Sequence, residues 1–172
     1  MIENDILTSS RVEHIAPIET NLPVEYLNHY KLDEWGELCY KHLGDAGFDL
    51  RAAIEQPIII RTMKYLGEHC KIVPAGIKFQ IPFGYEIQVR PRSGLAAKHQ
   101  LIIVNGPGTI DHKYRKEVHI ILMNLGAQDI VINPGDRVAQ AVLAAIPINV
   151  DIKKVKAVES TERGGFGSTG IT

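Results

Sequence analysis

The chain has 172 residues, of which 45% are hydrophobic and 23% charged, and its formal net charge is -1. This composition is typical of one soluble globular domain that is long enough to bury a sizeable core. The nearly balanced charge excludes a general affinity for nucleic acid or for a membrane surface, so any phosphate binding has to be local.

Cysteine and histidine usage excludes two further classes. Cys39 and Cys70 have no metal-binding spacing, and the seven histidines include no H-x-x-x-H pair. We therefore expect neither a disulfide framework nor a zinc site. The N-terminus lacks the basic and apolar regions of a signal peptide, and no apolar run is long enough to span a membrane. We expect a soluble, cytoplasmic protein.

The first 43 residues form an aromatic segment without a clear strand pattern. Its aromatic side chains include the only tryptophan and three tyrosines: Trp35, Tyr26, Tyr30 and Tyr40. Residues 24–38 are compatible with a short helix. We interpret residues 1–43 as an N-terminal elaboration of the same domain. The aromatic side chains either cover its core or, within residues 1–40, present a surface for a regulatory protein partner.

From about residue 54 the chain consists of short β-rich runs separated by glycine and proline turn signals. The predicted strands are 57–62, 71–73, 77–81, 85–90, 101–104, 118–125, 129–132 and 139–148. Residues 85–90 alternate between apolar and polar side chains, which is the period of a half-buried strand. No amphipathic helix of three turns is apparent after residue 50. The pattern predicts an all-β barrel or jelly roll over residues 44–160.

Two segments within this region combine turn signals with groups that could bind or activate a phosphate. The segment PRSGLAAK at 91–98 places Arg92, Ser93 and the Gly94 amide in succession at the end of a strand. The segment NGPGTIDHKYRKE at 105–117 places Asp111 after a glycine-rich bend, where a carboxylate can act as a general base. Ordinary turn chemistry is the alternative for both segments.

Two other segments carry polar side chains with less specific patterns. DAGFDLRA at 45–52 contains Asp45 and Asp49, which are either solvated loop groups or carboxylates that orient the water shell of a metal. PGDRVAQAVL at 134–143 carries Arg137 and Gln140, which could equally be exposed on a sheet edge.

The C-terminal segment RGGFGSTG at 163–170 is rich in glycine. Glycine lets backbone N–H groups close around an anion, Arg163 adds a planar cation, and Phe166 offers a face for a base. A frayed terminus is the alternative. The accidental G-x-G-x-x-G pattern lacks the strand and helix that dinucleotide binding requires. We interpret residues 161–172 as a flexible arm.

Taken in this order, the five segments resemble the five motifs of the trimeric deoxyuridine triphosphate nucleotidohydrolase (dUTPase) family, over about residues 44–170. The resemblance implies a jelly-roll or β-clip barrel with a flexible glycine-rich tail, assembled as a homotrimer with each active site at a subunit interface. It also implies Mg²⁺-dependent hydrolysis of dUTP to dUMP and pyrophosphate, with the metal held mainly by the substrate phosphates. Such a reaction keeps uracil out of DNA and supplies dUMP for dTMP synthesis.

The same resemblance assigns roles by motif position. Asp111 would activate the water that attacks the α-phosphorus, and Asp49 would orient either Arg137 or metal-bound water. The phosphate-binding residues would be Arg92, Ser93, Gly94, Gln140, Arg163, Gly167 and Ser168. The uracil- and deoxyribose-binding residues would be Asn105, Gly108, Thr109, Ile110, Tyr114 and Phe166. Tyr114 would pack under the deoxyribose and leave no room for a 2′-hydroxyl, while Phe166 would stack on uracil.

The chain departs from the dUTPase motifs at two places, and a related family offers an alternative activity. His112 and Lys113 replace an acidic or small pair, and we expect both side chains to face outward. The tail lacks two residues between Arg163 and Phe166, so Arg163 need not reach the γ-phosphate while Phe166 stacks. The related dCTP deaminases carry a catalytic glutamate where this chain has Ile121, and isoleucine cannot move a proton.

Overall fold

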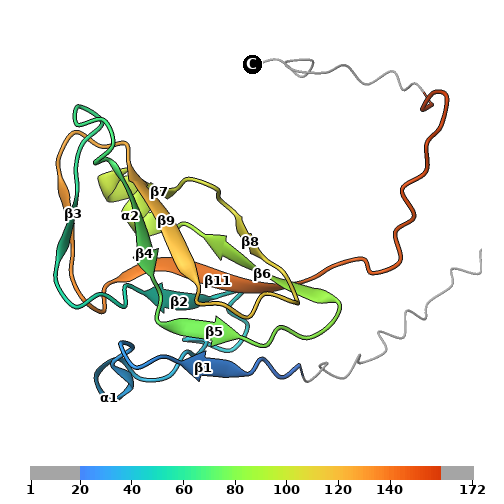
Figure 1. Cartoon of the computed structure of the whole chain (residues 1–172), viewed down its shortest axis with the longest axis horizontal. Coiled ribbons are helices and arrows are strands. Elements are labelled where there is room, and N and C mark those ends of the chain that lie inside the picture. Colours follow the sequence, from blue (N-terminus) through green and yellow to red (C-terminus); the bar gives the residue numbers. More distant parts are fainter. Residues whose placement is uncertain (1–19, 160–172) are drawn as a thin grey trace, which may run out of the picture.

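The computed structural model describes residues 20–159, which form an all-β body with two short helices (Figure 1). The strands are β1 (Val24–Tyr26), β2 (Phe48–Arg51), β3 (Ile58–Ile60), β4 (Cys70–Pro74), β5 (Ile77–Phe79), β6 (Tyr85–Arg90), β7 (Leu101–Ile103), β8 (Gly108–Ile110), β9 (His119–Asn124), β10 (Ile130–Ile132) and β11 (Arg137–Ala145). The helices are α1 (Leu32–Trp35) and α2 (Ser93–His99). Among the described residues, no helix is long and apolar enough to cross a membrane.

Antiparallel pairing joins these strands into four small sheets. The largest has the order β2-β11-β6-β8, and a three-stranded sheet has the order β4-β9-β7. Two-stranded pairs, β1-β5 and β10-β3, complete the set. The inward-facing aliphatic side chains pack into one core, in which Leu50, Ile87 and Ile120 are completely buried. Burial of this apolar surface is the main term that stabilises the fold.

Each of the eight predicted strands is present, with ends shifted by up to three residues. Three further strands, β1, β2 and β8, were not predicted. Each has only three or four residues, and β8 begins with a glycine. A period of two cannot be established over so short a run, so only long-range pairing reveals these strands.

The expected helix over residues 24–38 is wrong for most of its length. Val24 and Tyr26 form part of β1, which pairs with β5, and the helix is confined to α1. The intervening Glu25 points outward, where its carboxylate lies 2.9 Å from the Lys78 ammonium on β5. Pairing with an available strand edge thus outweighs the weak helical preference of the segment.

The aromatic side chains of this segment belong mainly to the core. Tyr30 and Trp35 are buried with their rings edge to face at 5.2 Å, and Tyr26 packs against Tyr30 at 4.9 Å. Tyr40 is half-exposed, but its ring contacts Phe48. The expectation that these aromatic residues present a surface for a regulatory partner is therefore not supported, because most of their side-chain surface packs against the core.

Candidate active site

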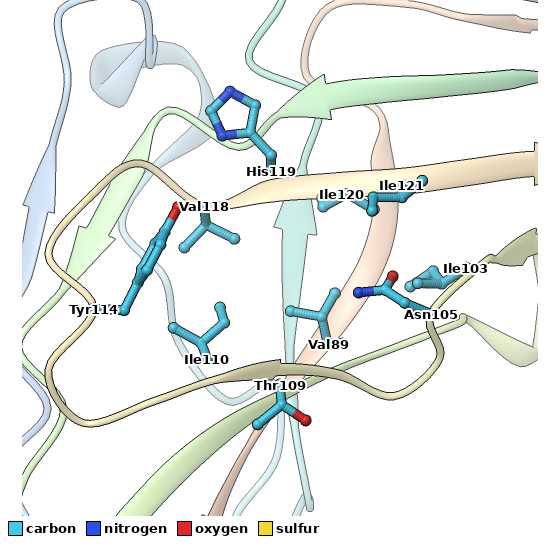
Figure 2. A pocket seen from close by; sticks show the side chains of 11 residues that line it. Val89, Ile103, Asn105, Thr109, Ile110, Tyr114, Val118, His119, Ile120 and Ile121 are labelled. Carbon is cyan, nitrogen blue, oxygen red and sulfur yellow. The ribbon is translucent and has the colours of Figure 1, made fainter.

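Most of the predicted site residues within the described part of the chain line one of two cavities, which share no lining residue; Asp111 and Arg137 line neither. We call them the β8 cavity, which lies beside β8 and β9, and the α2 cavity, which lies at the start of α2. The β8 cavity has a volume of about 180 Å³ and is lined by Val89, Ile103, Asn105, Gly108, Thr109, Ile110, Tyr114, Val118, His119, Ile120 and Ile121 (Figure 2). The α2 cavity, of about 380 Å³, is lined by Asp49, Arg92, Ser93, Gly94, Leu95, Lys98, His99 and Gln140.

The β8 cavity is an apolar slot with one amide at its rim. Val89, Ile110 and Val118 extend into it from three neighbouring segments, and the Asn105 amide points inward from the β7–β8 turn (Figure 2). Gly108 makes room for that amide, because a Cβ there would lie 3.2 Å from Asn105 Nδ2. A flat heterocycle with polar edges suits such a slot, since apolar walls accept its faces and the amide can pair with its rim.

Thr109 is placed differently from its neighbours on β8. Its side chain points away from the other lining side chains (Figure 2), as expected from the alternation between Gly108 and Ile110. Any contact of Thr109 with a ligand in this cavity would therefore use its main chain.

Tyr114 forms one wall of the β8 cavity, and its ring is fixed by its hydroxyl. Tyr114 Oη donates a hydrogen bond of 2.8 Å to the main-chain carbonyl of Glu117. The Tyr114 N–H donates to the Asp111 carbonyl at 3.0 Å, which closes the turn between the two residues. Both ends of the tyrosine are thus held, and the ring presents a rigid face to the cavity.

Asp111 follows β8 directly and is exposed; its neighbour Ile110 lines this cavity. The expectation that His112 faces outward is wrong. The His112 ring lies in T-shaped contact with Phe83 at 5.6 Å, and its Nδ1 lies 2.8 Å from the Ile81 carbonyl oxygen. Lys113 is exposed, as expected. His112 therefore fastens the turn to the β5–β6 connection while Asp111 stays accessible to water.

The α2 cavity is lined by the charged side chains of Asp49, Arg92 and Lys98, and Arg137 is bonded to Asp49. Arg92 Nε lies 2.9 Å from Asp49 Oδ1, and Arg137 Nη1 donates to Asp49 Oδ2 at 3.2 Å. Arg92 Nη1 also donates to the Arg137 carbonyl at 2.8 Å. Arg92 also lines the α2 cavity, and a guanidinium carries more N–H donors than these two contacts use. Asp49 was expected to orient either Arg137 or metal-bound water. In the structure its carboxylate contacts Arg137 and also Arg92.

Sheet register explains how these residues meet. Asp49 on β2 is the direct partner of Gln140 on β11, and the register slips between Arg137 and Ala139. Such a bulge changes the direction of a side chain, here that of Arg137. Gln140 Nε2 donates to the Pro91 carbonyl at 3.0 Å, which ties β11 to the segment before α2. Gly47 permits the close approach of the residues before β2 to β11, since a Cβ there would lie 2.7 Å from the Ala141 carbonyl oxygen.

Ser93 and Gly94 occupy the first positions of α2 and line the α2 cavity. Main-chain N–H groups at the start of a helix have no partner within it, so they are available to an anion. With Arg92, they form a compact set of donors of the kind that phosphate oxygens require. The predicted tail residues Arg163, Phe166, Gly167 and Ser168 lie outside the described residues.

Asp111 and Arg92 lie far apart along the same sheet. Ile110, the residue before Asp111, is paired with Ile87 on β6. Because the pairing is antiparallel, Asp111 lies one position beyond Ile87, whereas Arg92 follows Ile87 by five residues in the opposite direction. The two main-chain positions are therefore separated by roughly 20 Å along the strand direction. They lie beside different neighbours of β6, because β8 flanks one edge of that strand and β11 the other. One chain therefore does not bring its carboxylate and its phosphate donors to the same reacting atom.

Sequence patterns missed several lining residues. Lys98 and His99 reach the α2 cavity from the last turn of α2, and His119 lines the β8 cavity beside Val118. Lys98 belongs to the segment at 91–98, so the sequence could have identified it as a candidate. No sequence motif indicated His119, because it reaches the cavity only through the packing of β9 beside β8.

Two residues bear on the rival deaminase activity: Ile121, which replaces the deaminase glutamate, and Asn124, which follows it by three positions and opens an N-x-G turn. The Asn124 side chain is fully buried and donates to the carbonyls of Ile60 and Gln128. It also accepts a hydrogen bond from the Gly126 N–H. Ile121 lines the β8 cavity with an aliphatic side chain. Neither residue supplies a group for proton transfer.

No group of three or more His, Cys, Asp or Glu side chains that could hold a metal ion is present within residues 20–159. The carboxylate of Asp49 is already shared between two guanidinium groups. A divalent cation at this site would therefore need other oxygen ligands, as Mg²⁺ finds in water and in phosphate groups.

Comparison with known proteins gives a consistent result at two levels. A family model described as dUTPase matches residues 33–170. The deoxyuridine 5'-triphosphate nucleotidohydrolase of Caulobacter vibrioides (strain NA1000 / CB15N) is 48% identical over 137 residues, which cover 77% of this chain and 84% of that protein. The protein of the same name from Chlamydia pneumoniae is 47% identical over 145 residues, covering 83% of this chain and 97% of its own length.

Solved structures show the same fold. The dUTPase of Staphylococcus bacteriophage 80alpha with dUPNHPP superimposes with a TM-score of 0.73 over 89% of this chain and 100% of that chain, at 24% sequence identity. A mutant dUTPase from phage phi11 of S. aureus, whose structure concerns the coordination of a structural Mg(II) ion, gives a TM-score of 0.66 at 22% identity, over 80% of this chain and 98% of that chain. The predicted jelly-roll class of the fold is thereby confirmed.

Proposed function

Because the chain belongs to the dUTPase family, we propose that it is a dUTP diphosphatase, which hydrolyses dUTP to dUMP and pyrophosphate. The observation that carries the proposal is the chemistry of the two cavities. One is an apolar slot with the Asn105 amide at its rim, and Asp111 directly follows its lining residue Ile110; the other is lined by Arg92, Ser93 and Gln140. These are the parts that a base, a water molecule and a triphosphate require.

In the proposed reaction, Asp111 accepts a proton from water while the water oxygen attacks the α-phosphorus. The bond between the α-phosphorus and the bridging oxygen to the β-phosphate breaks, and pyrophosphate leaves with that oxygen. The exposed carboxylate suits this role because water can reach it, and the Tyr114–Asp111 turn holds its main chain in place. Arg92 and the first N–H groups of α2 stabilise the charge on the phosphate oxygens.

The β8 cavity would select the nucleoside. The Asn105 amide and nearby main-chain groups would pair with the edge of uracil, and the Tyr114 face would lie under the deoxyribose. A 2′-hydroxyl would then collide with a ring whose hydroxyl and main chain are both fixed. Discrimination by a rigid wall of this kind explains why UTP would be a poor substrate.

Mg²⁺ would enter with the triphosphate, because the described residues offer no protein cage for it. When bound, the ion would neutralise charge on the phosphate chain and help to orient it. Asp49 contributes instead by holding Arg92 and Arg137 in position.

A homotrimer with shared active sites would resolve the separation of the two cavities. The β8 cavity of one subunit would meet the α2 cavity of the next, so that Asp111 and Arg92 act on one nucleotide. Closed cyclic assemblies repeat one such contact at each interface. The C-terminal arm, with Phe166 over the base, would complete each site and exclude water.

The decisive experiment is pyrophosphate release from a panel of dUTP, dCTP, dTTP and UTP in the presence of Mg²⁺. Of these four nucleotides, we expect only dUTP to be hydrolysed at a substantial rate. Equal turnover of dTTP, or ammonia release from dCTP, would contradict the proposal, the latter because it would indicate deamination.

A further inference from the structure

Glu117 joins the N-terminal segment to the turn that carries Tyr114, the first through its carboxylate and the second through its main-chain carbonyl. Glu117 Oε1 accepts a hydrogen bond of 2.7 Å from the His29 ring and another of 2.9 Å from the Gly76 N–H. Its main-chain carbonyl accepts the Tyr114 hydroxyl at 2.8 Å. Because the carboxylate can only accept, His29 Nε2 is the donor. A single residue thus receives the tyrosine of the β8 cavity and a histidine that lies 88 positions away in the chain.

The His29 ring is itself presented by a rigid turn. The Tyr30 N–H donates to the Leu27 carbonyl at 2.9 Å, and the Tyr30 side chain is buried in the core. The Leu27 N–H donates to the Gly76 carbonyl at 2.8 Å, so Gly76 bonds both to this turn and to Glu117. Gly76 has a φ of +68°, and a Cβ there would lie 2.9 Å from the Tyr30 Cβ. Glycine at position 76 is therefore what allows this turn to pack close to Glu117.

Glu117 also leads directly into the wall of the β8 cavity. Its neighbour Val118 is buried, and the Val118 N–H and carbonyl are bonded to Ile77 and Ala75 at 2.9 Å each. His119 Nδ1 lies 3.1 Å from the Glu117 carbonyl oxygen, and its Nε2 lies 3.9 Å from Glu117 Oε2. A shift of the Glu117 main chain would therefore move Tyr114 relative to a wall that is fixed elsewhere.

We infer that His29 is a positioning residue for the sugar-binding wall, acting through Glu117 to hold Tyr114. This inference rests on the proposed function, since it assigns to the pair a part in the choice between deoxyribose and ribose. His29 precedes residues 33–170, which match the family model, so the contact joins a segment outside that match to the site. The N-terminal elaboration thereby acquires a role in substrate specificity.

The test compares His29→Ala, His29→Gln and Glu117→Ala with the wild type and with His42→Ala, an exposed histidine as a matched control. Pyrophosphate release is measured for dUTP and UTP, giving kcat and KM for each. In His29→Ala we expect the KM for dUTP to rise about fivefold with kcat within about twofold, because sugar binding rather than the chemical step is weakened. The ratio of kcat/KM for dUTP to that for UTP falls by a similar factor.

The other variants separate positioning from general stability. Glu117→Ala should resemble His29→Ala, while His29→Gln should restore the wild-type ratio, because its amide can donate from nearly the same point as Nε2. An unchanged ratio in His29→Ala, or an equal loss for both nucleotides with a lowered unfolding midpoint, would overturn the inference. Hydrogen exchange of residues 111–118 gives a readout independent of activity, and we expect faster exchange in His29→Ala.

These measurements keep the two proposals distinguishable. If the wild type does not hydrolyse dUTP, the proposed function fails, and hydrogen exchange still decides whether His29 holds the turn. If the wild type hydrolyses dUTP but His29→Ala matches it in both ratio and exchange, only the positioning role is wrong.

Discussion

Asp111 owes its accessibility to the residues around it. The His112 ring is fastened to the β5–β6 connection and the Tyr114 hydroxyl is bound to Glu117, while the carboxylate that precedes both anchors is exposed. A turn fixed by the side chains that follow the general base can hold that base in place without covering it. This arrangement explains how a short exposed segment can meet the positional demands of catalysis.

We predict that Asp111→Asn abolishes turnover while leaving the nucleotide bound. The amide has nearly the same volume but cannot accept a proton from water, and loss of a general base costs about 10²- to 10⁴-fold in rate. Pyrophosphate release measures the loss, and calorimetric titration with a non-hydrolysable dUTP analogue measures affinity. Retention of more than about a tenth of the wild-type rate would remove Asp111 from this role.

Asp49 has two opposing effects on the affinity for phosphate, because its carboxylate orients Arg92 and Arg137 but also neutralises part of their charge. Removing its charge would raise the attraction for phosphate, by about 1 kcal/mol for charges about 4 Å apart that are screened as in bulk water. Without the carboxylate, two arginine side chains would have to be immobilised on binding, at about 0.5–1.5 kcal/mol for each, or about 1–3 kcal/mol together. The second effect is the larger, so orientation should decide.

We therefore predict that Asp49→Ala raises the KM for dUTP by about tenfold, with kcat reduced less. Stability should change by under about 1 kcal/mol, because both ion pairs are partly exposed. Steady-state kinetics and urea unfolding measure the two quantities. Asp151→Ala, which removes an exposed pair with Lys153 at 3.3 Å, is the control. A lower KM in Asp49→Ala would show that charge outweighs orientation.

The sequence indicated most of these residues but not their contacts. Arg92 and Ser93 stand out because a strand end, an arginine and a glycine coincide in one short segment. The pairing of Arg92 with Asp49 could not be predicted, since it depends on β2 lying next to β11. His29 carried no signal at all, because its partner Glu117 is brought to it only by the packing of β1 on β5 and the Gly76 turn.

At the level of elements, the segment from β1 to α1 is held by its tyrosines. Tyr30 Oη donates to the Gly36 carbonyl at 3.0 Å, and Tyr26 Oη accepts from the Leu38 N–H at 2.8 Å. Burial raises the pKa of both hydroxyls above the ordinary value, and their mutual proximity raises that of Tyr30 further. The neutral, protonated forms are thus the ones compatible with the fold.

The raised pKa values of Tyr26 and Tyr30 make the stability of the fold depend on pH. A group whose pKa is raised on folding contributes stability that is complete below its unfolded pKa, near 10 for tyrosine, and that is lost as the pH rises through the folded value. We predict that the free energy of unfolding, measured by urea titration, declines above about pH 10. The decline should be shallower in Tyr30→Phe, which has no proton to lose at that position. Parallel curves for the two proteins would contradict this account.

At the level of the whole molecule, turn signals located eight of the strands, whereas the order of the sheets was beyond sequence reasoning. The runs between glycine and proline turns are bounded clearly, so β6 was predicted with its observed ends. β2 and β8 form the two outer strands of the largest sheet, yet each is too short to show a period. Their positions decide where Asp49 and Asp111 lie, so the separation of the two cavities emerged only from the structure.

That separation makes the assembly testable by mixing two inactive variants. Asp111→Asn removes the general base beside the β8 cavity, and Arg92→Ala removes a donor from the α2 cavity. If each site takes one cavity from each of two neighbouring subunits, a mixed assembly contains sites in which both contributing cavities are intact. Random mixing of equal amounts in a closed ring should restore about one quarter of the sites.

The measurement is pyrophosphate release after the two variants are unfolded together and refolded, with each variant refolded alone as the control. Sedimentation should show the same trimeric species in all three samples, so that lost assembly is not mistaken for lost chemistry. Because Asp111 and Arg92 lie roughly 20 Å apart along the sheet of one chain, a site within one subunit would need a large rearrangement. Activity in the mixture that stays at the level of the separate variants would mean that such a rearrangement occurs.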